Sequence, residues 1–242
     1  MLKYICINAT IYYRARTAFK RTKNLASYPE EVAGTAAGGI KMERKERTKR
    51  LVMLALLAAV LFLMAFTPLG YLRIGPLSIT FNTIPVAIGA IALGPVCGAI
   101  LGGVFGLTSV MGGSALVMTL MSINPVLAGI MCFVPRILEG LLAGFIAKGF
   151  NKTKISKPIS YGATGLLTAF MNTLFFMSAL VLLFGGTEFV QEKWTALAPG
   201  QNVIVFICMF VGINALVEMV STAVVSSAVS FALYKSKLIK NI

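Results

Sequence analysis

Three charged residues lie inside long apolar stretches of this chain: Arg136, Glu139 and Glu218. A charged side chain in a bilayer core costs several kcal/mol, so such residues mark a binding site, an ion pathway or a buried ion pair. Arginine suits an anionic ligand because its planar guanidinium matches a carboxylate. The two glutamates could serve instead as proton or ion sites, or they could pair with Arg136.

The composition excludes several kinds of chemistry. The chain has no His and no Asp, which removes Ser-His-Asp triads, aspartyl proteolysis and histidine-based metal sites. Its four cysteines are far apart in sequence and form no disulfide or metal framework. The nearest match to a nucleotide-binding loop, Gly144 and Gly149, has Phe150 in place of the lysine. We therefore expect no enzymatic activity, no metal ion and no cofactor.

Hydropathy places the chain in a membrane. Of its 242 residues 57% are hydrophobic and 12% are charged, whereas a soluble domain carries about 25% charged residues. The apolar runs match the roughly 20 residues of a spanning helix, and the alternation typical of barrel strands is missing. The net charge of +14 comes from basic residues that flank these runs, which argues against nucleic-acid binding.

Six apolar runs, separated by proline and glycine, predict an all-α integral membrane bundle of six transmembrane helices. The predicted spans are 51–67, 78–93, 96–111, 122–147, 159–184 and 203–234. Basic clusters before the first span, between the fourth and fifth, and after the sixth all fall on one side. The positive-inside rule then places both termini in the cytoplasm.

Two connections on the opposite side, 68–77 and 112–124, are too apolar for loops that face water. We interpret them either as lids packed over a site or as re-entrant segments and misplaced helix ends.

The N-terminal segment differs from the rest of the chain. Residues 1–41 hold seven Lys or Arg and two Glu, without a long apolar run. The sequence Gly-Gly-Ile-Lys before Met42 can be encoded as a ribosome-binding site followed by a start codon. We expect a basic tail at 1–41, disordered or an over-extended start, and a membrane domain at 42–242.

Polar residues on three spans are expected at one depth. If the fourth span starts at 122 and runs inward, Arg136 lies ~21 Å along it, past the midplane of a ~30 Å core. Glu139 shares its face. Asn172 on the fifth span, with Asn214 and Glu218 on the sixth, reaches a similar level. Facing inward, these groups would form the floor of a ligand cavity, unless Arg136 simply pairs with Glu139 or Glu218.

Small residues indicate close helix contacts. Ala55 and Ala59 form a small-x-x-x-small face on the first span, which lets another helix approach closely. The third span carries four glycines whose default explanation is tight packing: Gly98, Gly102, Gly103 and Gly106.

Several motifs of this chain occur together in one family of membrane proteins. They are the pair Ala55 and Ala59, the block RIGPLSITFNTIPVAIGAIALGP at 73–95, GAILGGVFGLTS at 98–109, VPRILEG at 134–140, and Asn172-Thr173. With them, the region from Met42 onward resembles the substrate-binding S-components of energy-coupling factor (ECF) vitamin transporters. Within that family the pantothenate-type branch is the most similar.

The resemblance implies a six-helix subunit of the prokaryotic cytoplasmic membrane that binds a water-soluble vitamin under its first and third loops. It implies docking through Ala55 and Ala59 on a transmembrane coupling subunit of the EcfT type, which sits on two ATPases. Pantothenate, a small monoanion with an amide and hydroxyls, suits one arginine and several asparagines. The expected ligand contacts are Arg136, Asn172, Asn214, Asn82, Arg73 and Asn124.

Two other functions stay open at this point. The chain could be an S-component for another vitamin such as folate, although a larger dianion asks for more cationic groups and stacking surfaces. It could also be a self-sufficient secondary transporter or channel that uses Glu139 and Glu218 as proton or ion sites. Uptake by this chain alone in liposomes would favour the second alternative.

Overall fold

A computed structural model describes residues 30–67, 70–74, 77–112, 115–197, 199–200, 202–236 and 238. The chain divides into two units, Met1–Leu51 and Val52–Ile242. Most of the predicted tail, 1–29, lies outside the described residues. The predicted boundary at 41/42 falls inside a helix that begins at Glu30, so the tail stays a prediction.

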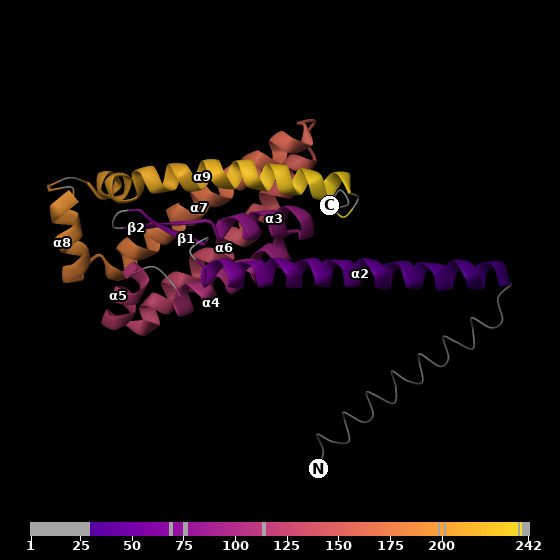
Figure 1. Cartoon of the computed structure of the whole chain (residues 1–242), viewed down its shortest axis with the longest axis horizontal. Helices are drawn as coiled ribbons and strands as arrows, with labels where there is room; N and C mark the ends of the chain where they lie inside the picture. Colours follow the sequence, from indigo (N-terminus) through magenta and orange to yellow (C-terminus); the bar gives the residue numbers. More distant parts are fainter. Residues whose placement is uncertain are drawn as a thin grey trace, which may run out of the picture. The chain divides into compact units, whose positions relative to one another are not determined.

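The described elements are mainly helices (Figure 1). They are α2 (Glu30–Ala65), β1 (Tyr71–Ile74), β2 (Leu77–Thr80), α3 (Thr83–Leu93), α4 (Pro95–Gly112), α5 (Ala115–Ile123), α6 (Pro125–Asn151), α7 (Lys157–Phe184), α8 (Glu188–Leu197) and α9 (Val203–Lys235). Stretches of α2, α4, α6, α7 and α9 are long and apolar enough to cross a membrane, and α3 is a shorter apolar helix. The predicted helical membrane bundle with six apolar helices is confirmed.

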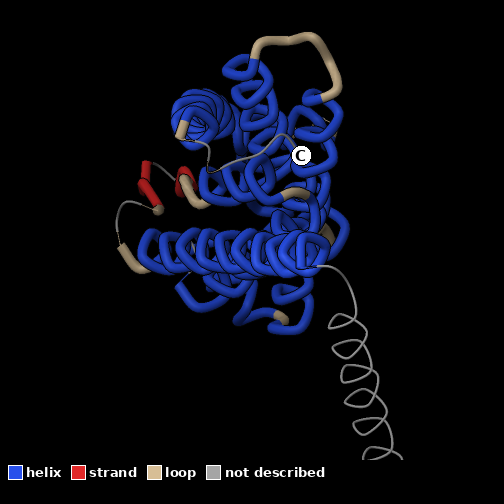
Figure 2. The backbone as a smooth tube through the Cα atoms, turned by 90° about the vertical axis from the view of Figure 1, so that its right-hand side faces the viewer, coloured by secondary structure: helices blue, strands red, loops and turns tan. Residues whose placement is uncertain are grey.

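The second span is shorter than predicted because its first residues form a strand. β1 and β2 pair antiparallel, with Tyr71 opposite Thr80 and Arg73 opposite Ser78 (red in Figure 2). α3 therefore begins at Thr83 and not at 78. Strand pairing satisfies backbone groups in an apolar segment, which explains how 68–77 can be poor in polar residues. The structure therefore adds a short β-hairpin to the predicted all-α fold.

The second apolar connection, 112–124, is largely a helix and not a loop. Leu116, Val117 and Leu120 of α5 are buried. Leu116 and Leu120 join a core cluster with residues of α6, α7 and α8, among them Met131 and Phe184. Burial thus accounts for the apolar sequence. α8, which contributes Val190 to that cluster, was not predicted.

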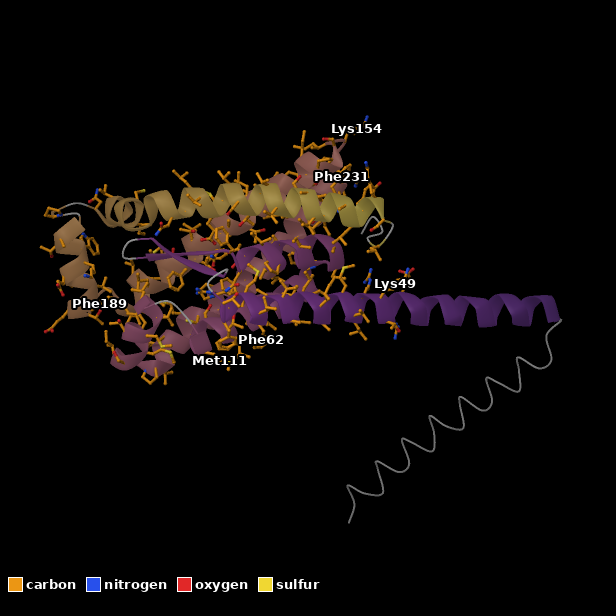
Figure 3. The ribbon with its side chains drawn as sticks, viewed as in Figure 1. Lys49, Phe62, Met111, Lys154, Phe189 and Phe231 are labelled. Carbon is orange, nitrogen blue, oxygen red and sulfur yellow. The ribbon has the colours of Figure 1, made fainter. Side chains whose placement is uncertain are left out.

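The two ends of the second unit carry different side chains. Lys154, between α6 and α7, and Phe231, near the end of α9, lie at one end, and Phe189 of α8 lies at the other (Figure 3). Lys235 also approaches the ring of Phe231, with Nζ 5.2 Å from its centroid. The basic α6–α7 connection and the end of α9 therefore share one side, as the positive-inside prediction requires.

α4 and α6 pack backbone against backbone. A Cβ atom added to Gly98 would overlap the carbonyl of Gly140, and one added to Gly102 would overlap the carbonyl of Arg136. At Gly106 the same atom would lie 2.9 Å from a carbonyl oxygen of α6. Only glycine permits this approach, so the packing role predicted for these glycines is confirmed at three of the four positions.

α7 and α9 lie side by side (Figure 1). Both helices carry buried polar residues at every fourth position. They are Ser160, Thr164, Thr168 and Asn172 on α7, and Glu218, Thr222, Ser226 and Ser230 on α9. Ser227 also donates a hydrogen bond to the carbonyl of Pro158, at 2.7 Å. This interface holds Asn172 and Glu218 at fixed positions.

The glycine contact between α4 and α6 gives a first prediction. Gly102→Ala should destabilise the protein by about 1–3 kcal/mol, because the new methyl group has no room beside the Arg136 carbonyl. Gly103→Ala is the matched control, since its Cβ would meet only the Ile137 side chain, at 3.7 Å. Thermal unfolding in detergent measures both. Equal shifts in the two variants would contradict the assigned contact.

Candidate functional site

Glu218 lies at the junction of three helices. Its Oε1 accepts a hydrogen bond from the Thr83 hydroxyl of α3, at 2.6 Å, and another from Asn172 Nδ2 of α7, at 2.9 Å. All three side chains are buried. Hydrogen bonds to a carboxylate are about twice as strong as neutral ones, so this group ties α3, α7 and α9 together.

The hydrogen bond to Glu218 fixes the direction of the Asn172 amide. With Nδ2 committed to the carboxylate, the buried Oδ1 of Asn172 has no partner. Asn82, which precedes Thr83, is fully buried, and neither its Nδ2 nor its Oδ1 has a partner. A buried polar group left unpaired costs about 1–3 kcal/mol. Such atoms are where a polar ligand would gain hydrogen bonds.

The chain that enters the hairpin covers Asn82. A Cβ atom on Gly70 would lie 3.0 Å from Asn82 Oδ1, and the Gly70 carbonyl accepts a hydrogen bond from the Phe81 amide, at 3.0 Å. Glycine is needed here because the same Cβ would also overlap the backbone of Met64. The hairpin is thus anchored directly over an unpartnered amide.

Arg136 is held by aromatic rings and by its own helix. Its guanidinium carbon lies 4.3 Å from the ring centroid of Phe176 and 5.2 Å from that of Phe105. Nη1 donates to the carbonyl of Met131, at 3.1 Å, and Nε has no partner. Among the described residues neither Glu139 nor Glu218 forms an ion pair with it. The predicted alternative of an internal pair is therefore not what the structure shows.

The direction of the Arg136 side chain explains this. Helical side chains tilt toward the N-terminus of their helix, and Arg136 turns back to Met131, away from the next turn where Glu139 lies. Both carboxylate oxygens of Glu139, which is fully buried, have no hydrogen-bond partner. Because α6 begins at Pro125, Arg136 lies about 16 Å along it. The guanidinium thus lies in the first half of α6, and its depth in the bilayer stays a prediction.

The predicted polar layer is only partly assembled. Asn172 and Glu218 meet, but Asn214 is half-buried one turn away and joins none of these hydrogen bonds. Asn124 caps α6, and its Oδ1 accepts from the amides of Val126 and Leu127, at 3.1 and 3.2 Å.

The remaining predicted residues lie on the hairpin and on α2. Arg73 lies on β1, and its side chain is outside the described residues. Ala55 and Ala59 are exposed on α2, whereas Leu57 and Leu61 of the same helix are buried against α3 and α4. The predicted docking face therefore points away from the bundle core. No group of three or more Cys, Asp or Glu among the described residues could hold a metal ion.

Three contact residues were missed by the sequence reasoning: Thr83, Phe105 and Phe176. Phe176 follows Asn172 by one helical turn, so the two share a face of α7. Phe105 lies three residues after Gly102 on the face of α4 that touches α6. These spacings place each ring on a helix face that turns inward, but they do not indicate that either ring contacts Arg136.

Comparisons with known proteins identify the family of this chain. Residues 49–230 match the family described as the substrate-specific component of ECF transporters. The chain is also 29% identical, over 196 residues, to the pantothenate transporter PanT of Leuconostoc mesenteroides subsp. mesenteroides, which covers 76% of this chain and 91% of the relative. Because the family match spans well over half of the chain, the protein belongs to the substrate-specific components of ECF transporters, which are membrane transport proteins and not enzymes.

Proposed function

We propose that this S-component captures pantothenate and delivers it inward together with a separate transmembrane coupling subunit of the EcfT type and two ATPases. The observation that carries the proposal is the Arg136 guanidinium, which is buried, without an ion pair among the described residues, and has an unpartnered Nε. Glu139 and Glu218 lie within electrostatic range of the guanidinium but form no salt bridge with it. An anionic ligand would supply the direct ion pair that is missing.

The chemistry of pantothenate fits the unpartnered atoms. Its carboxylate would bind the guanidinium of Arg136. Its amide and hydroxyl groups would bind Oδ1 of Asn172 and both amide atoms of Asn82, which need a donor and an acceptor. The similar protein of Leuconostoc mesenteroides carries the name pantothenate transporter, which supports the same ligand. Asn214, Asn124 and Arg73 stay weaker candidates for ligand contact.

A secondary transporter remains the second candidate function, because Glu139 is fully buried with two unpartnered oxygens. Such a carboxyl could bind a proton or ion. Proteoliposomes that hold this chain alone separate the two functions. Pantothenate uptake without coupling subunit and ATPases would support the secondary transporter and contradict the S-component mechanism.

Removing the cationic group tests the ligand site. Arg136→Ala should weaken pantothenate binding by about 2–5 kcal/mol, because the ligand carboxylate loses its buried partner. Isothermal titration calorimetry in detergent measures the change. Lys154→Ala removes an exposed cation at the far end of the unit and should leave the affinity unchanged. Unaltered affinity in Arg136→Ala, with lowered thermal stability, would make Arg136 structural.

Substitutions on the exposed face of α2 test whether this face docks on the coupling subunit. Ala55→Trp and Ala59→Trp should abolish ATP-dependent uptake in proteoliposomes that contain the coupling subunit and ATPases, because the bulky ring blocks close helix approach. Pantothenate binding to the isolated protein should persist. Val224→Trp, at another exposed apolar position, is the control and should transport normally. Loss of binding in the alanine variants would argue against a docking role.

A further inference from the structure

We propose that Phe105 and Phe176 form an aromatic clamp that positions the Arg136 guanidinium for the carboxylate of the ligand and keeps it away from Glu139. This inference rests on the proposed function, and it adds two positioning residues that would set the preference for an anionic ligand. Neither ring needs to touch the ligand.

The clamp is built from three helices. Phe105 comes from α4, Arg136 from α6 and Phe176 from α7, and the guanidinium carbon lies 5.2 and 4.3 Å from the two ring centroids. Both distances are within the ~6 Å at which a cation is attracted by an aromatic face. Phe105 is fully buried, so its ring cannot move aside without disturbing the core.

The ring contacts leave the guanidinium able to bind. Attraction to an aromatic face needs no oxygen acceptor, and the N–H donors of a guanidinium lie in its plane. One donor is used by the Met131 carbonyl, and Nε is unpartnered. The rings thus fix the orientation of the charge without consuming the edge that would bind a carboxylate bidentately.

The clamp also prevents a competing ion pair. Glu139 is three residues beyond Arg136 on α6, a spacing at which side chains can reach each other, and its oxygens are unpartnered. Glu218 is already bonded to Thr83 and Asn172. Without the rings, Arg136 could rotate toward Glu139, and that pair would compete with the ligand carboxylate for the same guanidinium.

Packing alone does not explain the arrangement. Phe105 belongs to an apolar cluster with Leu57, Leu61 and Leu101, which accounts for its own burial. It does not account for a cation placed within reach of two rings from different helices while a fully buried carboxyl one turn away stays unpaired. A structural role and a positioning role therefore predict different ligand dependence.

The test compares pantothenate with pantothenol, in which a hydroxymethyl group replaces the carboxylate. Phe176→Leu should lower the affinity for pantothenate about tenfold, a size between those expected for an exposed and a fully desolvated cation–π contact, because Phe176 is half-buried. The affinity for pantothenol should change less than about twofold. Phe176→Tyr, which keeps an aromatic face, should retain both affinities. Phe170→Leu, at an exposed position on α7, is the control and should match the wild type.

A double variant tests the competition. Adding Glu139→Gln to Phe176→Leu should restore most of the lost pantothenate affinity, because the competing carboxylate is gone. If Phe176→Leu aggregates, Phe176→Met keeps most of the ring volume and takes its place. Phe105→Leu should repeat the selective loss. All affinities are measured by calorimetry on variants whose thermal unfolding has been checked.

The outcomes separate this inference from the proposed function. Equal losses for pantothenate and pantothenol would make the rings merely structural and overturn the clamp. Failure of Glu139→Gln to restore affinity would likewise overturn it. If Arg136→Ala loses the preference for the anion but Phe176→Leu keeps it, the proposed function stands and the clamp is wrong. If the wild type binds no pantothenate, the proposed function itself fails.

Discussion

The backbone contact between α4 and α6 is the constraint on which the site depends. Because Gly98 and Gly102 have no side chains, the two helices approach until their backbones touch. Gly102 meets the carbonyl of Arg136 itself, and Phe105 lies one turn further along the same face of α4. The close approach therefore brings the Phe105 ring within reach of the guanidinium. A wider spacing between α4 and α6 would leave Arg136 without one of its aromatic neighbours. A carboxylate would then be its most favourable partner.

Some buried polar groups of this bundle bond within their own helix, and others have no partner. Thr164 donates to the carbonyl of Ser160, at 2.8 Å, and Thr168 to that of Thr164, at 2.7 Å, whereas the Ser160 hydroxyl itself has no partner. Such back-bonding costs little and suits a helix interface. An amide or a guanidinium is larger and has more donors and acceptors than one turn of helix can satisfy. The unpartnered atoms of Asn82 and Arg136 thus mark places where the fold alone leaves polar capacity unused.

Periodic apolar runs made the long helices predictable, and α4, α7 and α9 end within two residues of the predicted spans. The hairpin was missed because strands of four residues are too short to show alternation against an apolar background. For 112–124 the sequence left a lid and a re-entrant segment or misplaced helix end open, because burial by neighbouring helices, and not its own pattern, explains the sequence of α5. Depth arguments placed Asn172 and Glu218 at one level but did not predict their hydrogen bond, and the partners of Arg136 were not predicted either. They depend on the direction in which one side chain turns and on rings from two other helices, and neither is encoded in the local sequence.

The position of Glu139 suggests a role for this residue that the composition of the chain does not indicate. A buried carboxyl near a buried guanidinium would normally be interpreted as its counter-ion, yet Glu139 lies within electrostatic range of Arg136 without a hydrogen bond or salt bridge to it. In the proposed mechanism, Arg136 has two arrangements, one facing the ligand and one facing Glu139. The affinity for an anion then depends on the free-energy difference between these two arrangements. Aromatic contacts that favour the first arrangement strengthen binding without touching the ligand, because they lower the cost of reaching the competent state. Selectivity for an anionic vitamin would thus come from Arg136 and, equally, from the two rings that prevent an ion pair between Arg136 and Glu139.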